Sequence, residues 1–367
     1  MSAPEPDPLE AKIEAGELPV PRKRSTKSLV ITSIIGVIIM VGVFALLFPK
    51  LGSYEDALAQ LKNFSPQWLL ALVIAGVLNI VLYPLTVPAA IPEFSYRHSF
   101  IERQSGFLIS NVIPGGGAFA VGTQYAILSR YGVSASRAAA AVSADAIWTY
   151  LLTLGFPALA VILLVIEGRS TAGYTTLAIV GALAVAVSVI AIIVILRSDS
   201  GATKVGAFAQ KLINPVFKRL HKTAPDAIAG LVDFRGHAAT LVKERWIQLT
   251  ITNTIAQLTP FFVLLCALAG LGAYPTPVST VELFAAYAIA LVLTSFPLTP
   301  GGLGTVDAAL VALLVAFGAD SSTAVAADLI WRLVWFLPQL LVGMVTMSIY
   351  LIGKRRLSAT PSPGEAT

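Results

Sequence analysis

The sequence has few charged residues and almost no cysteine. Asp, Glu, Lys and Arg make up only 12% of the chain, whereas soluble globular proteins carry roughly 25%. A surface in contact with water on all sides would need more charge, so most of this surface is expected to face lipid. The one cysteine, Cys266, excludes an internal disulfide and a cysteine-based metal site. The three histidines have no ligand spacing, and no cofactor is predicted.

Long apolar segments take the place of the missing charge, since 56% of the residues are hydrophobic. A helix that crosses a membrane needs about 20 mostly apolar residues. Six segments qualify as spanning helices: Leu29–Phe48, Trp68–Ala90, Ser136–Ile166, Tyr174–Leu196, Trp246–Ala269 and Ser321–Ile352. Kinks are expected near Pro157 and Pro338. No small-residue cleavage site follows the first segment, so it is predicted to be an uncleaved helix.

Lysine and arginine predict the orientation in the membrane. They cluster at Arg22–Lys27, between Arg197 and Arg245, and at Lys354–Arg356. Because basic loops stay in the cytoplasm, both termini and the central loop are predicted to be cytoplasmic. Within that loop, Phe208–Leu220 is predicted to be an amphipathic helix lying on anionic lipid, or alternatively a solvated linker helix. The net charge of +5 follows these flanking positions, and no nucleic-acid partner is predicted.

Two further apolar segments are interrupted by glycine and proline. Phe107–Leu128 contains the run Asn111–Gly117, and Leu283–Phe317 contains the run Pro297–Gly304. If Phe107–Leu128 crossed completely, the later basic loops would fall outside the cell. We therefore predict two re-entrant hairpins, the first entering from the cytoplasm and the second from the outside. Non-helical backbone at membrane depth must be surrounded by protein or a wet cavity, so both hairpins should mark the interior.

The two halves of the sequence resemble each other. The run Pro114-Gly115-Gly116 recurs as Pro300-Gly301-Gly302, and Ala144–Trp148 recurs as Ala327–Trp331. Each half has three full crossings, and this odd number inverts the second half. The predicted fold is an all-α polytopic membrane protein, an inverted repeat with six long spanning helices plus two opposed re-entrant hairpins, about eight membrane segments. Interrupted segments at equivalent places in two halves indicate the central site of a transporter.

These boundaries divide the chain into five predicted regions. They are a disordered cytoplasmic tail (1–27), a first membrane repeat with its linking helix (28–196), a basic amphipathic cytoplasmic loop (197–245), a second membrane repeat (246–353) and a cytoplasmic tail (354–367).

Charged residues inside the apolar segments are candidate binding residues, since a charge at mid-bilayer costs roughly 3 kcal/mol or more. Asp328 and Arg332 are four apart, so they share a helix face. Arg332 is predicted to hold a lipid phosphate, with Asp328 orienting it or taking a proton; alternatively the two form a structural ion pair. Asp145 aligns with Asp328, but Thr149 replaces the arginine. Asp145 is therefore predicted to be protonated or to meet Arg332 across the pseudo-two-fold axis. Alternatively, Asp145 makes a polar contact between helices.

The hairpins supply further candidates. Asp307 begins the returning limb of the second hairpin, where the helix dipole favours a carboxylate and where N-capping alone could explain it. The amides of Gly301 and Gly302 could bind a head-group phosphate. Asn111 and Gln124 are the candidates in the first hairpin.

These motifs resemble a known family. Pro300–Gly304 with an acid three positions on, then Trp331-Arg332-Leu333 and Pro338 before Gly343, are similar to the flippase-like membrane domain of lysylphosphatidylglycerol synthases. The resemblance extends from about Ser28 to Lys354 and implies movement of a phospholipid or related lipid between leaflets.

The sequence departs from the family pattern in two places. The family usually has Glu where Asp307 stands, and often Gly-Glu-x-x-Arg where this chain has Gly122-Thr123-Gln124-Tyr125. The first hairpin therefore lacks both charges of that family pattern. Only 15 residues follow Ile352, so the soluble aminoacyl-transferase domain of the full synthases is not expected.

The predicted function is that of a flippase-like protein, not an enzyme, in the bacterial inner membrane. It would translocate a phospholipid or a related anionic or polyprenyl lipid, and its expected partners are membrane lipids with anionic head groups. One alternative is a membrane-embedded transferase acting on a lipid-linked substrate, although the sequence has no metal-binding Asp-x-Asp motif. The other is an accessory protein that holds a partner enzyme through its central basic loop.

Overall fold

The computed structural model describes residues 64–113, 116–168, 197–219, 226–295 and 299–358, with a few positions between 187 and 195. The predicted tail 1–27, the first predicted helix (Leu29–Phe48) and most of Tyr174–Leu196 lie outside these residues, as does the end of the chain from residue 359.

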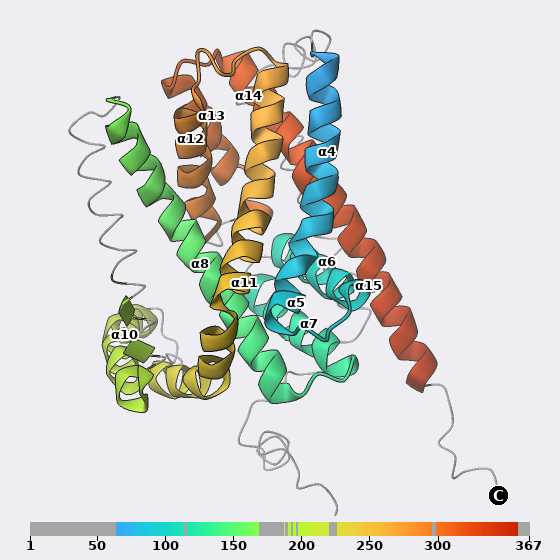
Figure 1. The fold of residues 1–367 in the computed structure, drawn as a ribbon, viewed down its shortest axis with the longest axis vertical. Helices are drawn as coiled ribbons and strands as arrows, with labels where there is room; N and C mark the ends of the chain where they lie inside the picture. The colour runs from blue at the N-terminus through green and yellow to red at the C-terminus, as the bar shows by residue number, and fades with distance from the viewer. Residues whose placement is uncertain are drawn as a thin grey trace, which may run out of the picture.

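The described residues form helices without strands (Figure 1). In chain order the elements are α4 (Pro66–Leu82), η1 (Tyr83–Leu85), α5 (Thr86–Ala90), α6 (Tyr96–Val112), α7 (Gly116–Arg130), α8 (Ala135–Ile166), α10 (Asp199–Arg219), α11 (Ala227–Gly270), α12 (Thr280–Val292), η2 (Leu293–Ser295), η3 (Pro300–Gly302), α13 (Thr305–Ala316), α14 (Ser321–Trp331), η4 (Arg332–Phe336) and α15 (Leu337–Ser358).

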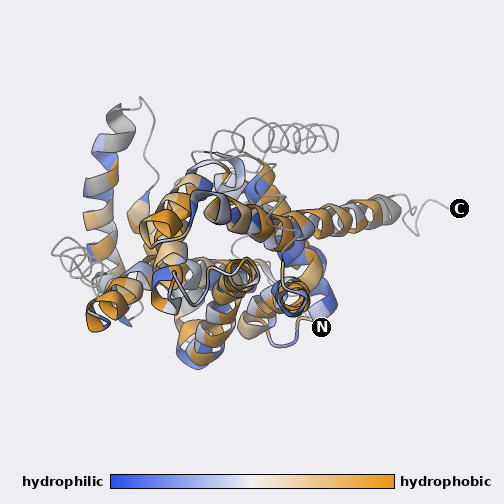
Figure 2. Cartoon of the chain, turned by 90° about the horizontal axis from the view of Figure 1, so that it is seen from above, coloured by the Kyte–Doolittle hydropathy of each residue, from blue (hydrophilic) through white to orange (hydrophobic). Residues whose placement is uncertain are grey.

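Four helical stretches are long and apolar enough to cross a membrane, and they match four of the six predicted spans. They are Pro66–Ala90, Ala135–Ile166, Ala239–Gly270 and Ser321–Ile352. The most apolar window of Ala239–Gly270 is 56% buried, against 33% for each of the others, so α11 is the central helix. It packs against α4, α8, α10 and α14. Hydrophobic residues predominate along the spanning helices (Figure 2), as expected for surfaces that face lipid.

The two interrupted segments fold as helical hairpins. The first pairs α6 with α7, and the second pairs α12 with α13. In Figure 1, α6 and α7 lie in the lower half of the molecule, whereas α12 and α13 lie in the upper half. The first hairpin begins earlier than predicted, since α6 starts at Tyr96 rather than at Phe107. Its first turns carry polar side chains that are nonetheless buried, among them Glu102, Arg103 and Gln104.

The tips of the two hairpins meet inside the protein. The end of α6 contacts η3, and a Cβ at Gly301 would lie 3.5 Å from the carbonyl oxygen of Asn111. Phe107 and Val112 of α6 share a buried cluster with Leu303 and with Phe336 of the last helix. Val112, Ile113 and Leu303, which flank the two turns, are therefore buried by protein, as expected for irregular backbone at membrane depth.

The last long helix is irregular just before Pro338, as predicted. Residues Arg332–Phe336 form a π-helical turn between α14 and α15. Proline lacks the N–H that would bond the carbonyl of Val334, and that carbonyl is packed tightly against Gly76 of α4. By contrast, α8 continues as one helix through Pro157.

The basic central loop contains more helix than was predicted. The amphipathic segment that begins at Phe208 belongs, as far as Arg219, to a longer helix, α10, and α11 begins already at Ala227. α10 packs closely on α11, because a Cβ at Gly206 would lie 2.7 Å from the Cα of Ile228. An ion pair between Arg235 and Asp199 also joins the two helices. Phe208 is left 64% exposed.

Candidate functional site

The glycine-rich turn of the second hairpin shapes a site for one arginine. Gly301, Gly302 and Gly304 have positive φ angles of 62°, 67° and 85°, a region that side chains disfavour. The turn leads into the first turn of α13. There the Gly304 N–H donates a hydrogen bond to Asp307 Oδ2 at 2.6 Å. The capping role predicted for Asp307 is therefore observed, and its second oxygen, Oδ1, remains available.

Arg332 supplies the cation at this turn. Its Nε donates to Asp307 Oδ1 at 2.5 Å, and its Nη1 donates to the Gly301 carbonyl oxygen at 3.2 Å. The guanidinium also lies 5.1 Å from the ring centres of Trp331 and Phe336. The side chains of Arg332 and Asp307 are 1% and 0% exposed. The ion pair thus joins the last long helix to the second hairpin and is shielded from solvent.

Asp328 is not the bonded partner of Arg332, and its role in taking a proton stays a prediction. It shares a helix face with Arg332, but the carboxylate bonded to Arg332 is that of Asp307. Asp328 is 0% exposed, and neither of its oxygens has a hydrogen-bond donor. Its charged neighbours are Asp307 and Arg332. One arginine therefore faces two buried carboxyl groups, and Arg332 Nη2 is itself without an acceptor.

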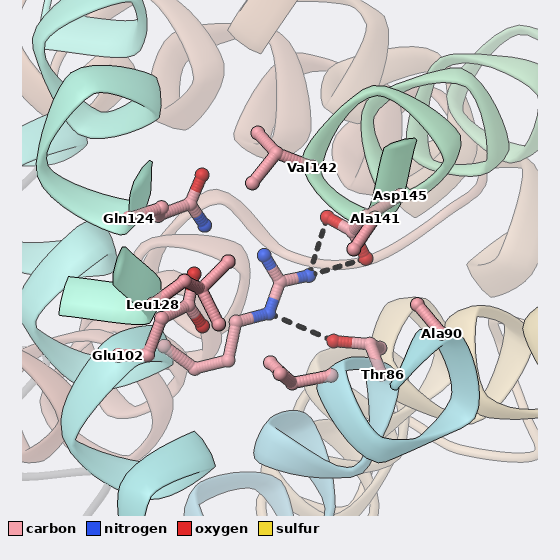
Figure 3. A pocket seen from close by; sticks show the side chains of 10 residues that line it. Thr86, Ala90, Glu102, Gln124, Leu128, Ala141, Val142 and Asp145 are labelled. Carbon is pink, nitrogen blue, oxygen red and sulfur yellow. Dashed lines mark hydrogen bonds and ion pairs between the residues drawn. The ribbon is translucent and has the colours of Figure 1, made fainter. Parts of the chain in front are cut away.

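A second ion pair, with a buried arginine and a partly buried aspartate, lies at the first hairpin (Figure 3). Nη2 of Arg103 donates to both carboxylate oxygens of Asp145 at 2.6 Å, and Nε donates to Thr86 Oγ1 at 2.7 Å. The guanidinium also lies 4.9 Å from the ring centre of Tyr83. The prediction that Asp145 meets Arg332 is therefore wrong; its partner comes from α6.

Sequence reasoning missed Arg103 because it lies between the predicted span Trp68–Ala90 and the predicted hairpin Phe107–Leu128, outside both apolar segments. The residue sits instead on α6, beside the equally buried Glu102 and Gln104. Two local signals were available. Ser95 caps the helix by accepting from the His98 N–H. The polar residues after it lead directly into a glycine-broken apolar run, which is unusual for a surface loop.

A small cavity adjoins the Arg103–Asp145 pair. It holds about 10 Å³ of free space, and Glu102 and Gln124 belong to its lining. Gln124 thus falls in this site, as Figure 3 shows. Asn111 does not: its side chain donates to the Phe107 carbonyl at 2.8 Å, and its backbone lies at the hairpin tip.

The predicted site residues therefore divide into two groups. Arg332, Asp307, Asp328 and the turn glycines gather at the second hairpin, while Asp145 and Gln124 lie at the first. In each group a buried arginine–aspartate pair ties a hairpin to a long apolar helix. The roles are exchanged, because the second hairpin contributes the acid Asp307 and the first contributes the base Arg103.

An open groove runs between α6 and α15 on the outside of the protein. Its volume is about 590 Å³, and it is walled by Phe100 and Ile101 of α6 and by Leu341, Val345 and Ile349 of α15, with Tyr96 and Arg97 also in its lining. The groove is therefore apolar along its length with a basic side chain among its lining residues. Within the described residues, no cluster of His, Cys, Asp or Glu is arranged to hold a metal ion.

Four apolar spans, two helical hairpins and two internal ion pairs among the described residues define a multi-pass helical membrane protein. A family model described as the lysylphosphatidylglycerol synthase TM region matches residues 33–343. The chain belongs to this family, as the motifs in its second half predicted. A search of curated proteins returned no match.

Proposed function

We propose that this protein moves a phospholipid, or a related anionic or polyprenyl lipid, between the leaflets of the bacterial inner membrane, as a transporter rather than an enzyme. Both termini lie in the cytoplasm in this proposal. Membership of the lysylphosphatidylglycerol synthase TM family supports a lipid-related role in the membrane.

The observation that carries the proposal is the Arg332–Asp307 pair at the tip of a broken hairpin. A buried ion pair gains little net stability, because the loss of hydration offsets the attraction. A lipid phosphate that entered the site would offer Arg332 the same bidentate geometry as a carboxylate. Exchange of Asp307 for phosphate would then release the hairpin from the last helix, with the phosphate replacing Asp307 as the counter-charge of Arg332.

The arrangement of the hairpins supports alternating access. They lie in opposite halves of the molecule, and their tips meet at Gly301 and Asn111. We interpret them as the re-entrant elements of an inverted repeat, in which one half rocks against the other around a fixed central site. The π-helical turn at Arg332 is suited to this motion, because such turns are frequent at functional sites.

The groove between α6 and α15 gives a lipid its route toward the interior. Acyl chains would lie against the apolar wall while the head group stays near Arg97. A volume of about 590 Å³ falls within the range of roughly 300–1,000 Å³ that is usual for ligand sites.

Reconstitution tests the proposal directly. Purified protein is placed in liposomes that carry a labelled anionic phospholipid or a labelled polyprenyl phosphate, and leaflet exchange is followed by chemical quenching of the outer label. The native protein should accelerate exchange, Arg332→Ala should not, and Arg137→Ala should match the native protein because Arg137 pairs with Glu93 at an exposed position. Exchange by the native protein no faster than in empty liposomes, across both lipids, would remove the proposal.

A further inference from the structure

The cavity beside the Arg103–Asp145 pair has an unbalanced charge. Arg103 is neutralised by Asp145 through two hydrogen bonds of 2.6 Å. Glu102, the next residue along the chain, is 2% exposed, belongs to the same cavity lining, and its Oε2 has no hydrogen-bond partner. If all three groups were ionised, this site would carry a net negative charge. An uncompensated buried charge is costly enough that such a group usually neutralises instead.

The surroundings of Glu102 limit how that charge can be balanced. On α6 its charged neighbour is Arg103, on α8 it is Asp145, and η1 contributes the hydroxyl of Tyr83. α5 and α7 add only neutral side chains to the cavity lining, among them Thr86 and Gln124. On the side of α15, Ser105 bonds the neutral Thr346. No further cation from the described residues reaches the cavity.

A metal cation does not suit this cavity. Its free space of about 10 Å³ is at the lower limit for a single water. A metal ion there would also lie against the guanidinium of Arg103, and that repulsion would oppose the attraction of the two carboxyl groups. A proton needs no space and is bound by Glu102 alone.

We propose that Glu102 is a proton-binding site which takes up and releases one proton in this cavity. The step is simple in its chemistry: the carboxyl group loses its proton to water that enters the cavity and regains it from there. When Glu102 is ionised, its carboxylate competes with Asp145 for Arg103, which weakens the tie between α6 and α8. Burial raises the pKa of Glu102 to about 7, which would place the exchange at physiological pH.

Proton binding at Glu102 does not depend on the proposed function. The further idea that this proton controls the first hairpin during lipid movement does rest on the proposed function. The two ideas can therefore fail separately, and the test is chosen for that reason.

The test is an infrared titration of the full chain in lipid nanodiscs between about pH 5 and pH 8. Native protein should lose the C=O band of a protonated carboxyl group with a midpoint near pH 7. Glu102→Gln keeps the size of the side chain and should lack that change. Glu244→Gln should retain it, because Glu244 is an exposed carboxylate on α11.

Three results would overturn the inference. They are a native spectrum with no carboxyl band that titrates in this range, a Glu102→Gln spectrum that titrates like the native one, and a midpoint that moves with sodium concentration. If Glu102→Gln does not fold, Glu102→Asp serves in its place and should retain the band at a different midpoint. A titrating band together with absent lipid exchange would uphold the proton site and reject the proposed function.

Discussion

At the scale of single residues, each half of the molecule buries one arginine, and the two halves do so with different partners. Each keeps an arginine inside a mostly apolar protein by pairing it with an aspartate and by placing it near aromatic rings. Each also retains one carboxyl group with an unpartnered oxygen, Asp328 in one half and Glu102 in the other. Among the described residues, these two groups are candidates for binding a proton.

Removal of Arg332 should be strongly destabilising. Arg332→Ala leaves Asp307 and Asp328 buried without a cation, and loss of one partner of a buried pair typically costs about 3–5 kcal/mol. Thermal unfolding in detergent should show this loss, whereas Arg137→Ala should change stability by less than about 1 kcal/mol. The double variant Arg332→Ala with Asp307→Ala should be less destabilised than the sum of the single changes. Additive effects would mean that the two side chains do not interact.

Gly301 should tolerate no side chain. Its φ is +62°, and a Cβ would lie 2.5 Å from the Phe336 ring. Gly301→Ala should therefore destabilise the protein by about 1–3 kcal/mol and reduce lipid exchange. Gly122→Ala is the matched control, because a Cβ there meets nothing within 4 Å, and alanine in a helix gains roughly 0.5–1 kcal/mol over glycine. Equal unfolding temperatures for the two variants would argue against a tight hairpin tip.

Stability should depend on pH through Glu102. Its pKa rises from 4.5 to about 7 in the folded protein because burial disfavours the charged form. The folded state therefore binds the proton more tightly than the unfolded state, so the contribution is complete below about pH 4.5 and is lost as pH rises through about 7. The unfolding temperature of Glu102→Gln minus that of native protein should increase across this window and then level off. A constant difference would contradict the raised pKa.

At the scale of the elements, α10 shows how a short amphipathic segment becomes a folded helix. Its small residues Ala202 and Gly206 are buried, whereas Phe208, Lys204 and Lys211 are exposed. An exposed aromatic ring flanked by lysines fits contact with an anionic bilayer surface better than a solvated linker.

A fluorophore attached to α10 should show whether this helix contacts lipid. Cys266 is buried, so Phe208→Cys in a Cys266→Ala background can be labelled with an environment-sensitive fluorophore. In bilayers with anionic lipid the emission should shift to the blue, and in neutral bilayers the shift should be smaller because the electrostatic attraction is lost. Lys243→Cys, an exposed position on α11, is the control. Emission typical of water at residue 208 in both bilayers would favour the linker interpretation.

At the scale of the whole molecule, the arrangement of the hairpins determines what the transporter proposal predicts. Ser134 lies between the first hairpin and α8, and Ser321 is the first residue of α14, shortly after the second hairpin; both are exposed. In a Cys266→Ala background, a membrane-impermeant thiol reagent should label Ser321→Cys in intact cells. Ser134→Cys should react only after the membrane is opened. Labelling of both positions from the same side would reject the inverted arrangement.

Part of this architecture could be predicted from local sequence. Apolar length located the four described spans, and the glycine and proline runs located both hairpin turns. The beginning of α6 was missed, because its polar residues indicate a surface loop until tertiary packing buries them. The same limitation applies to Arg103, whose side chain finds its partners only when α8 and α5 pack around it.

The sequence by itself determined the class of protein, the positions of the four described spans and of the two breaks, and the family, since all of these depend on hydrophobicity and backbone preference along short stretches. Only the tertiary structure decided which charges meet. Helical periodicity relates Arg332 to Asp328, four residues away, but its bonded partner Asp307 is 25 residues away, and Arg103 and Asp145 are 42 apart. Such pairs form because helix packing brings separate segments together and because a buried arginine must find a carboxylate wherever the fold provides one.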